Sequence, residues 1–128
     1  MKSREGLIRL KRFHVEERRR QAHQIETMIA EFERMAKELD DQIRVEQEKS
    51  GITDVTHFAY PTFAKAAMQR RDNLLSSAHE LKGQLGAAND EYVEAAAELE
   101  KMEALAERDS DRLAADARAE HRSVASAR

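Results

Sequence analysis

The sequence predicts an all-α protein in which two long helices form an antiparallel coiled-coil hairpin, followed by a frayed or disordered C-terminal tail. The 128 residues include only 4 glycines and 1 proline, so the chain has little turn material to connect more than a few elements. Charged residues make up 37% of the chain. In two long stretches, apolar residues recur at alternating steps of three and four, the spacing of a coiled-coil seam.

The first stretch predicts a helix over residues 4–49. Lys11 and Arg18 fall on seam positions near its start, which weakens the apolar seam there. Ser50 and Gly51 mark its end, because glycine can adopt the left-handed conformation that closes a helix. The larger seam residues of this helix are Ile8, Val15, Ile25, Ile29, Phe32, Leu39 and Ile43.

Residues 50–61, here called the tip, are predicted to connect the two helices. Thr53 or Asp54 is placed to cap a short turn over residues 55–58. Pro61 has a fixed φ and no N–H, so it suits the start of a new helix and not its interior.

The second stretch predicts a helix over residues 62–109, which completes a hairpin domain over residues 1–109. Gly83 and Gly86 lie inside it and mark a bend, a close contact or slack in a long helix. Residues 110–128 form a polar tail rich in Ala and Arg, expected to be frayed or disordered. The seam residues are Leu74, Leu81, Leu85, Tyr92, Leu99 and Met102.

An antiparallel alignment lets each helix bury its only seam. Pairing Ile43 with Ala67 near the tip opposes residues whose numbers add up to about 110, and helices of about 40 residues would then form a rod of roughly 60 Å. The charges agree with this register. Residues 1–20 have a net charge of +5 and residues 90–111 a net charge of −7, and the two segments face each other. Such ion pairs select the alignment more than they stabilise it.

Several functional classes are unsupported by the sequence. It has no cysteine, its 5 histidines are scattered, and it lacks a glycine-rich phosphate loop or a nucleophile elbow. We therefore expect no enzymatic activity, no metal site and no cofactor. No apolar stretch is long enough for a membrane span, and the first residues do not form a secretory signal. A net charge of −3 and few aromatics argue against a nucleic-acid partner.

Two features have alternative interpretations. The basic first turns around Arg18, Arg19 and Arg20 either pair with the acidic part of the second helix or contact phosphates or an acidic protein surface. Phe58, Tyr60 and Phe63, here called the aromatic cluster, are three of only six aromatic residues. They either close over Ile43 and Ala67 or dock on a partner.

Three segments carry a resemblance to a known family. Ser3 to Phe13 (SREGLIRLKRF), Gln24 to Met35 (QIETMIAEFERM) and Ser50 to Lys65 (SGITDVTHFAYPTFAK) resemble the flagellar export protein FliJ in the form found in alphaproteobacteria. The resemblance covers about residues 3–107 and is most distinctive at the tip.

The resemblance implies a non-enzymatic component of the flagellar type III export apparatus, cytoplasmic and peripheral at the inner membrane. Its partners would be the hexameric export ATPase, the cytosolic region of the export-gate membrane protein and export chaperones. The end with both termini would contact the ATPase, and the surface nearer the tip would contact the gate. By position, the ATPase candidates are Arg9, Lys11, Arg12, Arg18, Arg19 and Arg20, and the gate or tip-contact candidates are Leu39, Ile43, Phe58, Tyr60, Pro61 and Phe63.

A generic coiled-coil scaffold or dimerisation adaptor is the alternative. The mass in solution discriminates between the two, because a monomeric hairpin fits the export component and a parallel dimer of extended helices fits the adaptor.

Overall fold

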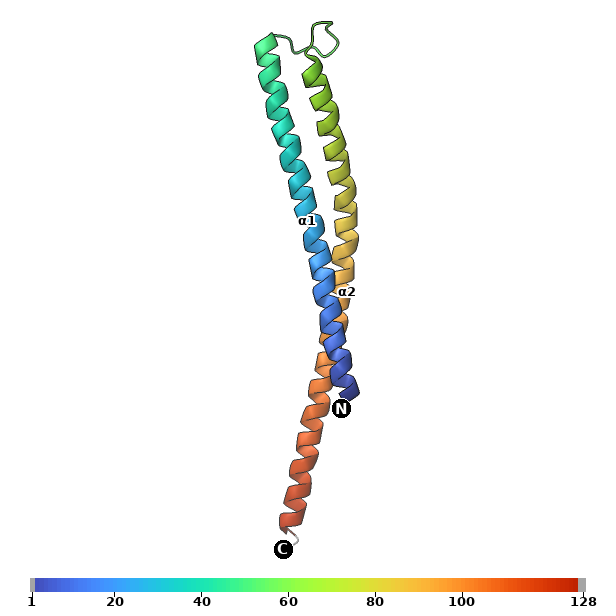
Figure 1. The fold of residues 1–128 in the computed structure, drawn as a ribbon. Helices are drawn as coiled ribbons and strands as arrows, with labels where there is room; N and C mark the ends of the chain where they lie inside the picture. Colours follow the sequence, from blue (N-terminus) through green and yellow to red (C-terminus); the bar gives the residue numbers. More distant parts are fainter. Residues whose placement is uncertain (1, 127–128) are drawn as a thin grey trace. The chain divides into compact units, whose positions relative to one another are not determined.

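The computed structural model describes residues 2–126, and it contains two long helices joined by the tip (Figure 1). Helix α1 spans Lys2–Ser50 and helix α2 spans Thr62–Ser126. No strand occurs between residues 2 and 126. The prediction of an all-α helical hairpin is therefore confirmed.

The chain divides into two compact units, and each contains a stretch of both helices. One unit consists of residues 20–89 and includes the tip. We call it the tip unit. The other consists of residues 1–19 and 90–128. We call it the terminal unit, and its described part is residues 2–19 and 90–126.

The buried face of α1 follows the predicted seam. Ile8, Ala22, Ile29, Ala36 and Ile43 are buried and lie seven residues or a multiple of seven apart. This spacing returns each side chain to the same side of the helix, so the buried residues form one continuous stripe. The other seam residues of α1, Val15, Ile25, Phe32 and Leu39, are half-buried.

The buried residues in the described part of α2 are all alanine. Ala64, Ala67 and Ala78 are buried, which lets the two backbones of the tip unit lie close together. Small side chains also lose little rotamer entropy on burial, so such a seam forms at low entropic cost. The larger seam residues, which are Leu74, Leu81, Leu85, Tyr92, Leu99 and Met102, are half-buried.

Ion pairs between the helices fix the register within each unit. In the tip unit Arg71 pairs with Asp40, and in the terminal unit Lys11 pairs with Glu98. Their residue numbers add up to 111 and 109, close to the predicted 110. Opposed pairs of this kind require antiparallel helices, so the predicted direction and register are correct within each unit.

Helix α1 ends as predicted. Gly51 has a φ of 71°, and its N–H donates to the carbonyl of Gln47 at 2.9 Å. This is a left-handed cap, in which the Gly51 N–H satisfies one of the carbonyls left without a donor at the helix end.

Helix α2 continues beyond the predicted end at residue 109. The described part of the tail, residues 110–126, is one continuous helix, and all of residues 111–125 are exposed. The reason is local: this segment is rich in Ala and Arg, which favour helix, and it contains no Gly or Pro. Residues 127–128 of the predicted tail lie outside the described part of the chain.

The two glycines within α2 allow a test of helix stability. A Cβ atom added at Gly83 or Gly86 would meet nothing within 4 Å, which excludes the close contact considered from the sequence. Both Gly83→Ala and Gly86→Ala should therefore raise the free energy of unfolding by up to about 1 kcal/mol. Urea unfolding followed by circular dichroism measures the change. Gly51→Ala is the matched control and should lower stability, since its positive φ is strained for alanine.

Candidate functional site

The tip begins with a turn that Asp54 caps. Its Oδ1 accepts hydrogen bonds from the Thr56 N–H at 3.0 Å and the Thr56 hydroxyl at 2.7 Å, and its carbonyl accepts the His57 N–H at 3.1 Å. Of the two capping candidates, Asp54 is the one that caps. Because the Thr56 hydroxyl and N–H stabilise the ionised carboxylate, they lower the pKa of Asp54.

His57 and Phe58 form a stacked pair of rings in the tip. The His57 Nδ1 accepts a hydrogen bond from the Ala59 N–H at 3.0 Å, which fixes the imidazole against its own backbone. The Phe58 ring stacks on this imidazole, with 4.8 Å between ring centroids and an interplanar angle of 21°. Phe58 is 96% exposed. The turn therefore holds an apolar ring in solvent in an ordered orientation.

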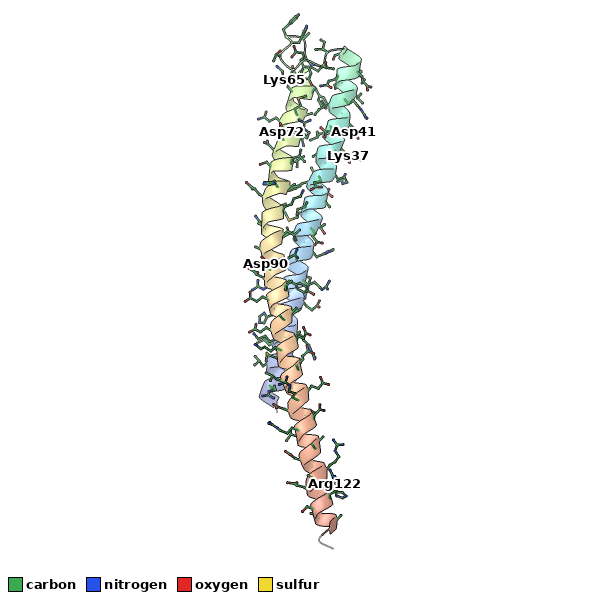
Figure 2. The ribbon with its side chains drawn as sticks, turned by 180° about the vertical axis from the view of Figure 1, so that it is seen from behind. Lys37, Asp41, Lys65, Asp72, Asp90 and Arg122 are labelled. Carbon is green, nitrogen blue, oxygen red and sulfur yellow. The ribbon has the colours of Figure 1, made fainter. Side chains whose placement is uncertain are left out.

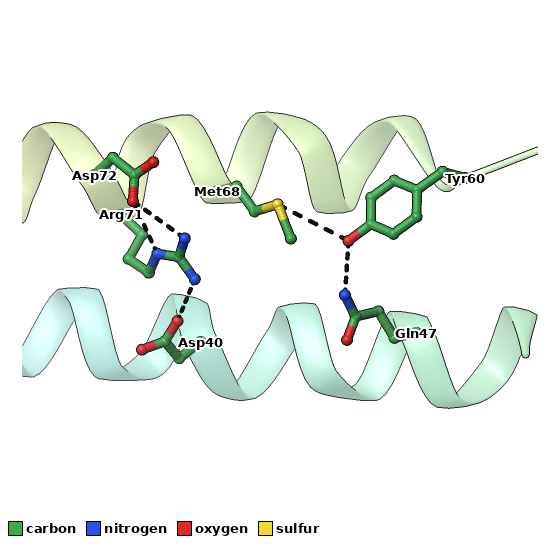
Figure 3. Close-up of polar contacts among 6 residues, drawn as sticks. All are labelled: Asp40, Gln47, Tyr60, Met68, Arg71 and Asp72. Carbon is green, nitrogen blue, oxygen red and sulfur yellow. Dashed lines mark hydrogen bonds and ion pairs between the residues drawn. The ribbon is translucent and has the colours of Figure 1, made fainter. Parts of the chain in front are cut away.

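Tyr60 faces the opposite way, into the base of the tip. It is only 5% exposed, and its hydroxyl accepts a hydrogen bond from Gln47 Nε2 at 2.9 Å and contacts Met68 Sδ at 3.9 Å (Figure 3). The aromatic cluster thus divides between the two interpretations. Tyr60 closes the end of the seam, whereas Phe58 and Phe63, the latter 56% exposed, do not.

The other gate candidates differ in accessibility. Ile43 is 5% exposed, like Tyr60, and both belong to the packing of the hairpin itself. Leu39 and Pro61 are half-buried. Of the six candidates, Phe58 and Phe63 are the two that offer an apolar ring to another molecule without any rearrangement.

The basic candidates in α1 are largely engaged in ion pairs. Lys11 pairs with Glu98 at 3.2 Å, Arg12 with Glu103 at 3.3 Å and Arg18 with Glu91 at 2.8 Å. These contacts support the interpretation that the basic turns pair with the acidic part of α2.

The remaining basic candidates are Arg9, Arg19 and Arg20. Arg19 pairs with Glu16 on its own helix at 2.9 Å, and this hydrogen bond raises the pKa of Arg19. Arg20 also has an electrostatic or hydrogen-bonding partner. Arg9 is exposed and makes no ion pair within residues 4–125.

Charged residues also occupy seam positions that the sequence analysis left out of the seam. The Arg71 side chain is 25% exposed and contacts Asp40 at 2.7 Å and Asp72 at 3.1 Å (Figure 3). Asp109, at the predicted end of the second helix, is half-buried and pairs with Arg4. The seven-residue spacing from Ala78 back to Arg71 is the signal that could have identified this position.

The described residues contain no metal-binding cluster: no three His, Cys, Asp or Glu side chains within residues 4–125 are grouped to hold an ion. Within the same residues, every buried side-chain nitrogen and oxygen has a hydrogen-bond partner. In the described part of the chain, neither helix is long and apolar enough to cross a membrane.

Comparison with known proteins adds no relative. No family model, no curated protein and no solved structure matches the chain.

The Lys11–Glu98 ion pair can be tested by charge reversal. Lys11→Glu should lower the free energy of unfolding because it opposes two carboxylates, and adding Glu98→Lys should recover it, with a coupling of about 0.2–1 kcal/mol that shrinks as salt is added. Urea unfolding of the four proteins gives the coupling. Arg9→Glu is the control, because the same charge change there breaks no ion pair. A coupling of zero at low salt would contradict the assigned pair.

The Asp54 turn should respond to acid. The pKa of Asp54 is lowered in the folded chain, so the ionised carboxylate stabilises the turn. This stabilisation is fully present above the usual aspartate pKa of about 3.9 and is lost as the pH falls through the lowered value. The NMR shift of the Thr56 amide proton should follow this titration, and Asp54→Asn should abolish it. An amide titration at or above the usual aspartate pKa would contradict the turn.

Proposed function

We propose that the chain is a non-enzymatic coiled-coil component of the flagellar type III export apparatus. In this role it links the export ATPase to the cytosolic region of the export gate and escorts substrate chaperones. It would act on the cytoplasmic side, peripheral at the inner membrane.

The observation that carries the proposal is the tip. Its sequence, within Ser50 to Lys65, is the most distinctive part of the resemblance to FliJ. The same segment holds Phe58 at 96% exposure on a turn ordered by Asp54 and His57. An exposed ring on an ordered turn loses little entropy on binding, and aromatic residues dominate the energy of protein interfaces. We therefore assign the gate contact mainly to Phe58.

The terminal unit supports a second contact. Its basic turns are paired with carboxylates of α2, and those pairs are exposed, so competition with another charged surface costs little. Arg9 is already available for such a surface. An ATPase contact at this unit would therefore be dominated by charge and weakened by salt.

A coiled-coil dimerisation adaptor is the second candidate, and exposed apolar side chains in the terminal unit favour it. Leu7 and Leu105 are both exposed and line one surface hollow with Met102. Light scattering during gel filtration separates the two candidates: a monomer supports the export component, and an obligate dimer supports the adaptor.

Deletion of the gene in the bacterium that encodes it tests the proposed function. We expect loss of flagellin from the medium and loss of swimming in soft agar, with both restored by a plasmid copy. Unchanged secretion and motility in the deletion strain would refute an export role.

The variant Phe58→Ala tests whether the tip contacts the export gate. Removal of a central aromatic anchor typically costs 2 kcal/mol or more, so binding to the purified cytosolic region of the gate should weaken by about 30-fold. The helix content should not change, because Phe58 contributes to no buried contact. Val93 is also an exposed apolar residue, but it lies in the terminal unit and not in the tip unit. Val93→Ala is therefore the matched control and should leave binding intact. Equal binding by the Phe58 variant would show that the tip is not the gate contact.

A further inference from the structure

One face of the tip unit is hollowed between α1 and α2. Two adjoining hollows of about 180 and 320 Å³ share Gln42 as a wall residue. We call them together the trough. Its lining from α1 includes Met35, Leu39 and Val45, and its lining from α2 includes Phe63 and Leu74.

The trough exposes apolar side chains that the hairpin does not bury. Val45 is 42% exposed and Phe63 is 56% exposed, and Met35, Leu39 and Leu74 are half-buried. On α1, Met35, Leu39, Gln42 and Val45 are separated by four, three and three residues. This spacing places them along one side of the helix. A third helix packs into the groove between two helices with this periodicity.

The charges on the two walls differ. The α1 wall carries Glu38, Asp41 and Glu46, whereas Arg70 is the charged residue of the α2 wall. Asp41 lies one turn from Lys37 on α1 (Figure 2).

Local pairing leaves part of this charge for a partner. Arg34 pairs with Glu38 at 2.6 Å, and Arg44 lies 3.6 Å from Asp41. Glu46, in contrast, makes no ion pair within residues 4–125, and neither does Arg70.

We propose that the trough binds an amphipathic helix of another protein, with an apolar stripe facing Val45 and Phe63 and a basic edge facing the α1 wall. Residues 35–46 span about 16 Å at 1.5 Å per residue, so the bound helix needs about three turns. A carboxylate on its opposite edge would meet Arg70 and set its direction. This inference rests on the trough alone and holds whether or not the protein serves flagellar export.

The charges disfavour a second copy of this chain as the occupant. Two troughs packed about a two-fold axis would place the acidic α1 wall either against its own copy or against an α2 wall with Arg70 as its cation. In the first arrangement like charges oppose each other and reduce affinity. In the second arrangement the single cation Arg70 meets three carboxylates, so the α1 wall favours a more basic partner than a second copy.

In-cell cross-linking tests the proposal. The photoreactive amino acid p-benzoylphenylalanine replaces Val45 or Phe63 in the full chain, produced at its natural level. Leu75, which is 44% exposed and does not line the trough, is the control position. We expect both trough positions to cross-link to a segment of another protein with apolar residues at helical spacing and a basic edge. Glu46→Lys, at the carboxylate of the α1 wall that has no ion pair of its own within the described residues, should reduce the yield about fivefold, since one lost exposed ion pair is worth up to about 1 kcal/mol.

Three results would overturn the proposal. These are cross-links to a second copy of this chain, cross-linking no stronger than at Leu75, and a captured segment with an acidic edge or without a helical apolar stripe. The captured segment, made as a synthetic peptide, then gives a second measurement with the purified chain. Val45→Glu and Phe63→Glu should weaken its binding at least tenfold while Leu75→Glu does not, and helix content confirms that each variant is folded. Equal binding by all variants would also refute the trough as the site.

Discussion

The repeated burial of one side chain per seven residues is the constraint on which the rest of this structure depends. Ile8, Ile29 and Ile43 fill that position in α1, and only an antiparallel α2 from the same chain covers them. Because a seam between two helices uses one narrow stripe of each, most other side chains remain at the surface. A two-helix protein therefore has ample surface for partners and little interior for chemistry.

Within the tip unit, the same constraint separates structural residues from candidate binding residues. Tyr60 ends the α2 seam, and its hydroxyl is satisfied by Gln47, so its ring serves the fold. Phe58 lies only two residues earlier, but the hydrogen bonds of the turn hold it outside the seam. Neighbouring aromatic residues thus have opposite roles because one lies on the seam and the other does not.

The sequence was sufficient for the two helices up to residue 109, their direction and their register, because these follow from spacing and charge that are local or repeated many times. It also identified Gly51 as the helix end and narrowed the turn cap to Thr53 or Asp54, because both roles depend on backbone conformation within a few residues. It missed the continuation of α2 to Ser126, because this segment has no apolar seam to indicate a packed helix. It could not show that Tyr60 is buried while Phe58 is exposed, since the exposure of Phe58 depends on the backbone path of the whole tip. It also missed Arg71 as a seam residue, because a charged side chain at such a position is tolerated only when a partner such as Asp40 lies opposite.

The charged seam positions have a consequence for misalignment. A seam rich in alanine offers few distinctive side chains, so sliding one helix past the other by seven residues would still place small apolar residues together. The charges make that shifted state less stable than the correct alignment. In the terminal unit, a slip in one direction would bring Lys11 to Glu91 and leave Arg18 facing Gln84, and a slip in the other would bring Arg18 to Glu98 and leave Lys11 facing Leu105. Each shifted state forms one ion pair among these four residues in place of two. Only the correct alignment gives both Lys11 and Arg18 a carboxylate partner.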